Sequence, residues 1–231
     1  MLKKAIFIYG CLIASIFVII SGCSWSINRG GLYPMIDEQT HKWGFISTTN
    51  KWEIQPEFEH AHNFTEGLAG VKLNDVWGFI DTSGKMVISP SYDVVYEFSE
   101  GLAPVRINTR WAFIDHNGKV IISGNYEHAT EFSEGLAAVQ EDDFWLFLDK
   151  TGKTAFDGKY QEARPFKEGL AAVRIGSAVW GYIDKTGKVV IEAKYESAGD
   201  FKNNTANITK NGKPFYIDKS GKILGTGAVK Q

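Results

Sequence analysis

The sequence contains few cysteines and no long run of charge, and each of these features excludes a class of protein. Only Cys11 and Cys23 are present among 231 residues. Cys11 lies inside an apolar N-terminal run, so we expect no disulfide bond within the folded domain, even in an oxidising compartment. The formal net charge is -2, and neither a basic cluster nor an acidic tail stands out. We therefore expect no nucleic-acid partner.

The signals of helical repeats and of common catalytic or metal sites are also missing. No long stretch carries apolar side chains at three-to-four spacing, so the helical repeat folds fit poorly. No Gly-x-Ser-x-Gly elbow, phosphate-binding glycine loop or dinucleotide fingerprint is present. His60 and His62 alternate along the chain, but the sequence marks no third ligand for zinc. These observations predict a protein without catalytic residues, cofactor or metal.

What the chain does contain is a repeated segment. The stretch Trp-Gly-Phe-Ile-Asp that begins at Trp77 recurs in related copies. A degraded copy that has lost the Trp and the Gly begins at Pro214. Counted from Trp43 to Pro214, successive copies are 34, 34, 34, 35 and 34 residues apart. A fixed period of this size is the mark of a repeat architecture. The remaining copies begin at Trp111, Trp145 and Trp180.

Each repeat contains three short segments that predict β-strands. In the copy that starts at Gly169, these segments are 170–175, 180–184 and 188–191. They are rich in aromatic and β-branched side chains and are bounded by glycine or polar residues, which is the strand signature. A further segment, 195–201, is compatible with a turn, a short helix or a fourth short strand, and its pattern does not decide between them.

Two recurring glycines predict obligatory turns. One follows the repeated Asp by three residues, as Gly84 does, and Asn50 replaces it in the first copy. The other precedes Leu-Ala, as Gly135 does, and Asn204 replaces it in the last copy. Glycine with asparagine as its substitute points to a left-handed backbone. With Asp at its start, the first turn is typical of a hairpin with a type I turn and a glycine bulge.

The glycine that follows Trp is of a different kind. Ala112 and Leu146 replace it in two copies. A bulky leucine would resist a positive φ angle. We therefore expect an ordinary strand position there, where glycine at most allows close packing.

Together these motifs resemble a known family. Trp-Gly-Phe-Ile-Asp, Gly-Lys with a following aliphatic run, Tyr-Asp/Glu, and Phe-x-Glu-Gly-Leu-Ala-x-Val resemble the bacterial WG-repeat family, also called KWG. The resemblance covers about residues 31–225. It implies an all-β repeat array in a surface or exported protein, and it implies little chemistry.

We predict an all-β domain over 31–231 that contains six antiparallel repeats of about 34 residues, with about three strands each. Two arrangements fit: an open, twisted array, or a closed six-bladed ring like a β-propeller. Propeller blades usually have four strands and about 40 or more residues. The first and last copies are degraded, which suits the capping repeats of an open stack. Both points favour the open array.

The acidic and aromatic residues that recur between repeats are expected to have structural roles rather than roles in binding or catalysis. Asp81 and its equivalents start a turn, and we expect each to cap that turn through backbone N–H groups. Glu134 and its equivalents precede the turn glycine, and we expect turn residues or exposed acids there. The repeated tryptophans are expected in the core between repeats rather than on a sugar-binding surface.

The N-terminal residues predict a targeting signal rather than a part of the folded domain. Two lysines precede an apolar run over 5–20, the order found in secretory signals. Ile20-Ser21-Gly22-Cys23 resembles the lipobox of bacterial lipoproteins, whose cysteine is lipidated. The resemblance implies a signal peptide over 1–22 and a lipidated tether over 23–30. It also implies a bacterial cell-envelope location on the extracytoplasmic side, at the outer membrane if the host has two membranes.

The residues that differ between copies are the candidates for binding. They gather at the tips expected between the first two strands of each repeat, where a single-residue insertion before Trp180 also falls. Insertions in repeat proteins map to loops, often on the binding face. The charge alternates from tip to tip, which favours a protein or mixed polar partner. The candidate residues are Lys72, Asn74, Asp75, Asn108, Arg110, Glu141, Asp142, Asp143 and Ser177.

The sequence thus predicts a membrane-anchored, non-enzymatic binding or scaffold module that displays a β-repeat surface to a protein or glycan of the cell envelope. Two alternatives from other classes stay open. One is a lipoprotein enzyme or carbohydrate-processing subunit with an unrecognised site. The other is a structural spacer of the envelope.

Overall fold

The computed structural model describes residues 31–176 and 179–226. The predicted signal peptide, the tether with Cys23, and the candidate residue Ser177 lie outside these residues. Within the described ranges, no helix has the length and apolar character needed to cross a membrane.

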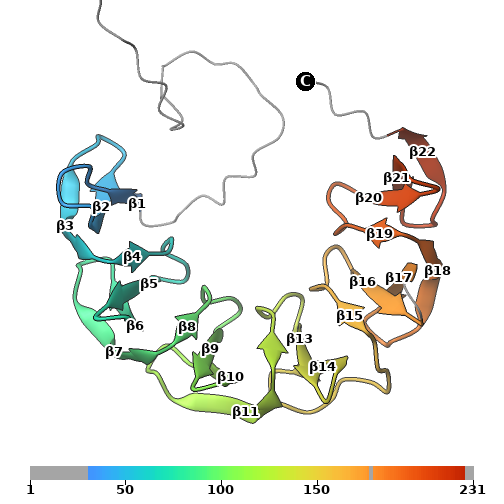
Figure 1. Cartoon of the computed structure of the whole chain (residues 1–231), viewed down its shortest axis with the longest axis horizontal. Coiled ribbons are helices and arrows are strands. Elements are labelled where there is room, and N and C mark those ends of the chain that lie inside the picture. The colour runs from blue at the N-terminus through green and yellow to red at the C-terminus, as the bar shows by residue number, and fades with distance from the viewer. Residues whose placement is uncertain (1–30, 177–178, 227–231) are drawn as a thin grey trace, which may run out of the picture.

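The described chain forms six small antiparallel sheets that follow one another along an arc (Figure 1). The first contains β1 (Leu32–Ile36), β2 (Trp43–Ser47) and β3 (Trp52–Phe58), and the second β4 (His60–Ala61), β5 (Leu68–Leu73), β6 (Val76–Asp81) and β7 (Met86–Tyr92). The third contains β8 (Val94–Val95), β9 (Ala103–Ile107), β10 (Arg110–Ile114) and β11 (Val120–Tyr126), and the fourth β12 (His128–Ala129), β13 (Leu136–Glu141) and β14 (Phe144–Asp149). The fifth contains β15 (Glu162–Ala163), β16 (Leu170–Ile175), β17 (Val179–Asp184) and β18 (Val189–Tyr195), and the sixth β19 (Ser197–Ala198), β20 (Thr205–Lys210), β21 (Lys213–Asp218) and β22 (Ile223–Thr226).

The second to sixth sheets each begin with a strand of only two residues at one edge. This strand comes from the segment whose structure the sequence did not decide: β19, for example, follows Tyr195 and pairs with β20. Each of these sheets therefore joins the end of one sequence repeat to the start of the next. Four sheets have four strands rather than the expected three, because two residues are too few to show the alternating pattern of a strand.

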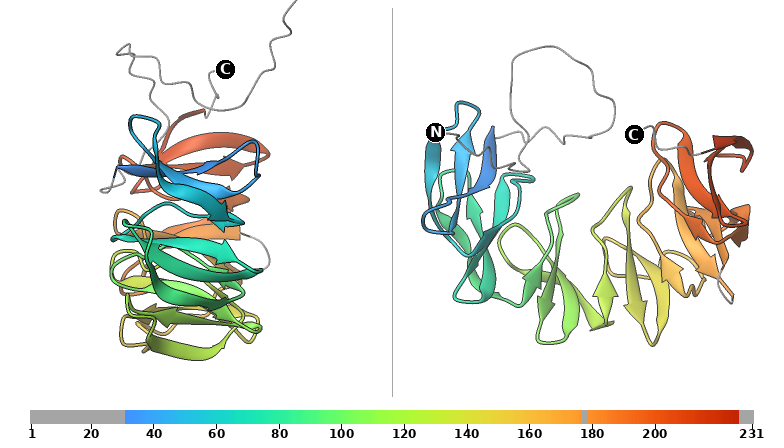
Figure 2. Two further views of the ribbon diagram at one scale, coloured as in Figure 1. Left: turned by 90° about the vertical axis from the view of Figure 1, so that its left-hand side faces the viewer. Right: turned by 45° about the horizontal axis from the view of Figure 1, so that its top comes forward.

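The arc stays open, as predicted. The first and sixth sheets lie at its two ends and do not pair with each other (Figures 1 and 2). Most of the sheets have four strands, as a propeller blade does. The expectation of three strands per repeat was therefore not a valid argument against a closed ring. The sixth sheet gives better evidence of an end: its outward face carries Thr205, Asn207 and Thr209, and Tyr216 there is 47% exposed. A polar outer face is what a terminal repeat needs for solubility.

The hydrophobic cores lie between neighbouring sheets. Successive side chains of a strand point to opposite faces, so Phe79 and Ile80 of β6 enter different cores. Phe79 shares a core with Val105 of the third sheet, and Ile80 shares one with Phe45 of the first. Burial of each such side chain stabilises the fold by about 1.5–3 kcal/mol. No sheet can gain this energy alone, because each core needs two sheets.

Both predicted glycine turns are present. Gly84 has a φ of 85°, and its N–H donates a hydrogen bond to the carbonyl of Asp81. A Cβ at Gly84 would lie 3.3 Å from Ile54 of the preceding sheet, so glycine serves both the backbone and the packing. Gly135 has a φ of 89° and nothing within 4 Å of the place of a Cβ. At Gly135 only the backbone conformation calls for glycine.

The glycine after Trp occupies a strand position, as predicted, and allows two strands to approach closely. A Cβ at Gly181 would lie 2.6 Å from the carbonyl oxygen of Ile191 on the outer strand β18. Leu146 occupies this position in the fourth sheet, which lacks a regular outer strand. Isolated bridges of Tyr160 with Trp145 and of Thr154 with Leu148 take the place of that strand. The bulk of Leu146 explains the interruption.

Candidate functional site

The turns of each sheet lie at two opposite ends of its strands. We call one end the variable rim; it carries the tips between β5 and β6, β9 and β10, β13 and β14, β16 and β17, and β20 and β21. We call the other end the clasp rim; it carries the Glu-Gly turns, such as 134–135, and the Asp turns, such as 184–187. All the described candidate residues from the sequence belong to the variable rim.

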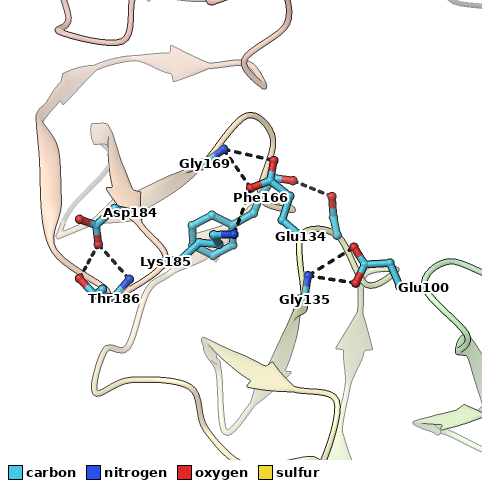
Figure 3. A network of polar contacts seen from close by, with 9 residues as sticks. Glu100, Glu134, Gly135, Phe166, Gly169, Asp184, Lys185 and Thr186 are labelled. Atoms are coloured by element: carbon cyan, nitrogen blue, oxygen red, sulfur yellow. Dashed lines mark hydrogen bonds and ion pairs between the residues drawn. The ribbon is translucent and has the colours of Figure 1, made fainter.

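On the clasp rim, each repeat holds the next one through a glutamate. Glu134 and Gly135 both have positive φ angles, 57° and 89°, and form a two-residue hairpin. The carboxylate of Glu134 accepts two hydrogen bonds, at 2.9 and 3.1 Å, from the N–H of Gly169 in the following repeat (Figure 3). The hydroxyl of Ser133 donates a hydrogen bond of 2.6 Å to the carbonyl of Phe166. Equivalent carboxylate contacts are made by Glu66, Glu100 and Glu168.

A lysine or a histidine side chain from the following turn completes each of these contacts. Lys219 lies 3.3 Å from Glu168, and His116 takes the corresponding place 3.1 Å from Glu66. The N–H of Asn204 and, against an opposing effect of burial, the ammonium group of Lys219 lower the pKa of Glu168. The glutamates are turn residues, as predicted. Their role in binding one repeat to the next is one that the sequence did not indicate.

The repeated aspartates cap their own turns, as predicted. The carboxylate of Asp184 accepts hydrogen bonds from the N–H and the hydroxyl of Thr186 (Figure 3). It accepts a further hydrogen bond from the N–H of Lys188. The hydroxyl of Thr186, followed by its N–H, lowers the pKa of Asp184. These carboxylates are therefore occupied within their turns.

A third acid, the one that follows the repeated Tyr or Phe, supports the variable rim. The carboxylate of Glu59 accepts hydrogen bonds from the N–H groups of Asn74 and Asp75, at 3.0 and 3.1 Å. Glu196 does the same for the N–H of Gly212. Sequence reasoning gave this acid no role, although its place in the Tyr-Asp/Glu motif was the available signal.

The tryptophans are largely covered. Trp111 and Trp180 are buried, which confirms the core prediction for these two, whereas Trp43, Trp77 and Trp145 are only half-buried. In the second and third sheets, a residue near the start of the same sheet covers the ring. The ring of His62 lies 4.4 Å from that of Trp77, and Tyr96 stacks on Trp111 at 4.9 Å. The ring faces are therefore engaged within the chain.

The predicted binding residues lie at exposed hairpin tips along the variable rim. Asn74, Asp75, Asn108, Asp142 and Asp143 all adopt positive φ angles at these tips. Three of the charged candidates already have partners within the rim. Lys72 and Asp75 pair with each other at 2.9 Å, and Arg110 pairs with Glu127 at 3.4 Å.

Exposed apolar side chains flank these tips, and sequence reasoning missed them. Ile107, Phe144 and Val179 are 38%, 39% and 38% exposed. They lie at the strand ends that border the tips of the third, fourth and fifth sheets. The available signal was an apolar residue at each of these hairpin positions. In the described part of the chain, no three His, Cys, Asp or Glu side chains gather in a way that could hold a metal ion.

The repeats match a known family of sequences. Five tandem segments match the WG containing repeat: 43–77, 77–111, 111–145, 147–177 and 180–213. The chain belongs to the WG-repeat family. In this WG protein the family motif supplies the turn acids, the turn glycines and the core side chains described above. Among curated proteins, none matches the chain by sequence.

Solved structures with a similar fold are distant in sequence. A eukaryotic initiation factor has a TM-score of 0.57 at 13% identity, over 84% of this chain and 62% of that chain. Kluyveromyces lactis Hsv2 has a TM-score of 0.55 at 7% identity, over 82% of this chain and 71% of that one. The computationally designed Ika8 protein has a TM-score of 0.51 at 13% identity, over 79% and 66%. The WG protein thus spans about two thirds of the length of these structures, and the likeness concerns the fold alone.

Proposed function

We propose that this WG protein is a membrane-anchored, non-enzymatic binding module whose variable rim contacts a protein of the bacterial cell envelope. The observation that carries the proposal is the contrast between the two rims. The acids that recur from repeat to repeat, such as Asp184 and Glu134, are engaged in hydrogen bonds within the chain. The residues that differ between repeats gather at the exposed tips of the variable rim, where their differences can specify a partner.

The chemistry of the variable rim suits a protein surface. The tip of the fourth sheet carries the acidic residues 141–143, and the tip of the third sheet carries the cationic Arg110. Ile107, Phe144 and Val179 add exposed apolar area beside these charges. Protein interfaces combine apolar contacts with a polar surround in this way.

The membrane anchor rests on the lipobox-like segment that ends at Cys23. An acyl chain together with protein contacts gives stable attachment. We expect the full chain to fractionate with membranes and its Cys23→Ser variant to be released. Mass spectrometry that finds the natural chain unmodified at Cys23 would contradict the anchor.

The binding role is tested by site-specific photocrosslinking in the native envelope. A photoreactive residue at Phe144 is expected to crosslink to a discrete envelope protein, whereas one at Ser89 on the exposed outer strand β7 is not. Combined changes of Ile107, Val179 and Arg110 to serine should abolish the Phe144 crosslink while leaving the melting temperature nearly unchanged. Equal crosslinking from both positions, or retention of the triple variant's crosslink, would reject the variable rim. Retention on purified cell-wall glycan without any protein crosslink would assign a glycan partner instead.

A further inference from the structure

The convex side of the arc is formed by the outer strands of the sheets, among them β3, β7, β11 and β18 (Figure 1). Each of these strands lies at the edge of its sheet. An edge strand presents N–H and C=O groups that can pair with another chain. Native proteins therefore blunt such edges with proline, charged side chains, bulges or very short strands.

Most of the outer strands carry such protection. Pro56 interrupts β3, and Pro90 interrupts β7. Glu192 and Lys194 place charges on β18. In the fourth sheet, isolated bridges take the place of a regular outer strand. These edges are therefore poor templates for a further strand.

The outer strand of the third sheet lacks this protection. β11 has seven residues and contains neither proline nor a charged side chain, and Gly124 stands where β3 and β7 have proline. Val120 and Ile121 at its start are 43% and 40% exposed. Within residues 31–176 and 179–226, β11 pairs only with β10. An uncharged edge that is rich in β-branched residues is of the kind that pairs with another strand.

A second copy of this chain suits the edge of β11. Two strands of one sequence can pair antiparallel about a two-fold axis, and an uncharged strand then meets no like charge. The same arrangement brings Lys119, which precedes the strand, toward Glu127, which follows it, in the other copy. The side chain of Glu127 is paired with Arg110 in its own copy and is still 40% exposed. Because β11 lies near the middle of the convex side, two arcs can meet there back to back, with their other sheets diverging on either side (Figure 1).

We propose that β11 is the docking site for a second copy of this chain, which adds its own β11 in antiparallel orientation and makes one continuous sheet across the two copies. β11 runs from the clasp rim toward the variable rim, because it follows the Asp115 turn and ends at Tyr126, the partner of Trp111. Antiparallel pairing therefore places the variable rim of one copy on the same side as the clasp rim of the other. The dimer presents a variable rim on each of its two sides.

Analytical ultracentrifugation of the full chain in a mild detergent tests the dimer. We expect two copies per particle. Ile121→Lys should raise the dissociation constant at least about tenfold, because a two-fold axis brings the new charge into the interface twice. Val87→Lys is the matched control, since Val87 holds the same place in β7 and is 42% exposed, and it should leave the dissociation constant unchanged. A natural chain that stays monomeric, or equal losses in the two variants, would overturn the proposal.

Two further measurements identify the strand and its occupant. Hydrogen exchange of the β11 amides should slow as the protein concentration rises, whereas that of β18 should not; exchange in β11 that ignores concentration would overturn the proposal. A photoreactive residue at the exposed Ser123, in cells that hold two differently tagged copies, should join one tag to the other. Crosslinking of Ser123 only to a different protein would reject the second copy as the occupant. These outcomes are independent of the variable rim, so a monomer that still crosslinks from Phe144 would reject the dimer and keep the proposed function.

Discussion

The carboxylate of Glu134 lies 2.9 Å from the backbone nitrogen of Gly169, so an acid in one turn holds the turn of the next repeat. Glu134 itself has a positive φ, which is unfavourable for a residue with a side chain. The hydrogen bonds to Gly169 offset this strain. A glutamate at this position thus stabilises a contact between two sheets, although its positive φ makes its own turn less stable.

We expect Glu134→Ala to destabilise the domain by about 1–2 kcal/mol, because it removes the charge-assisted acceptor and keeps the positive φ. Urea unfolding followed by circular dichroism measures the change. Glu192→Ala, at an exposed position of β18, is the matched control and should have little effect. Equal losses in the two variants would show that the clasp contributes nothing to stability.

Gly135→Val should destabilise more than Leu146→Val. The first change forces a branched residue into a left-handed conformation and costs about 1–2 kcal/mol or more, although no neighbour obstructs the new side chain. The second is a modest change of volume in a half-buried strand position. Thermal unfolding of both variants provides the comparison, and identical melting temperatures would contradict the conformational argument.

Gly181→Ala should also destabilise, but for a steric reason. The added Cβ would lie 2.6 Å from the carbonyl oxygen of Ile191, so β17 and β18 must separate, at a cost of about 1–3 kcal/mol. Gly225→Ala serves as the control, because nothing lies within 4 Å of its added Cβ. Hydrogen exchange should rise in β18 of the Gly181 variant alone; unchanged exchange there would count against the close approach.

The stability of the domain should fall in acid. The pKa of Asp184 is lowered in the folded state by the Thr186 hydroxyl, and the pKa values of Asp81, Asp115, Asp149 and Asp218 are lowered in equivalent turns. A depressed pKa contributes stability above the unfolded value, about 3.9 for Asp, and this stability is lost as the pH falls through the folded value. Urea midpoints should therefore drop below about pH 4. Asp184→Asn should flatten this dependence, and an unaltered slope would refute the assignment.

Sequence reasoning succeeded where the residue types found at one repeat position indicate the local backbone conformation. The exchange of Gly135 with Asn204 across repeats revealed a left-handed turn without any tertiary information. It failed where the role of a residue depends on a partner that is distant in the sequence. Nothing near Glu134 in the sequence indicates Gly169 as its partner, and the two-residue strand β19 is too short to show a pattern. The exposure of Phe144 follows from how the sheets pack, which local sequence does not contain.

The cores described above lie between pairs of sheets and are shared by no third sheet. The energy of the array is therefore close to a sum over neighbours, and no interior residue holds the whole molecule together. Such a chain can gain or lose a unit by duplication or deletion of about one period without redesign of the rest. Unfolding can begin at an end and proceed one sheet at a time. Among the described residues, the first and the sixth sheets each share a core with one neighbour, so fraying should start at these two sheets.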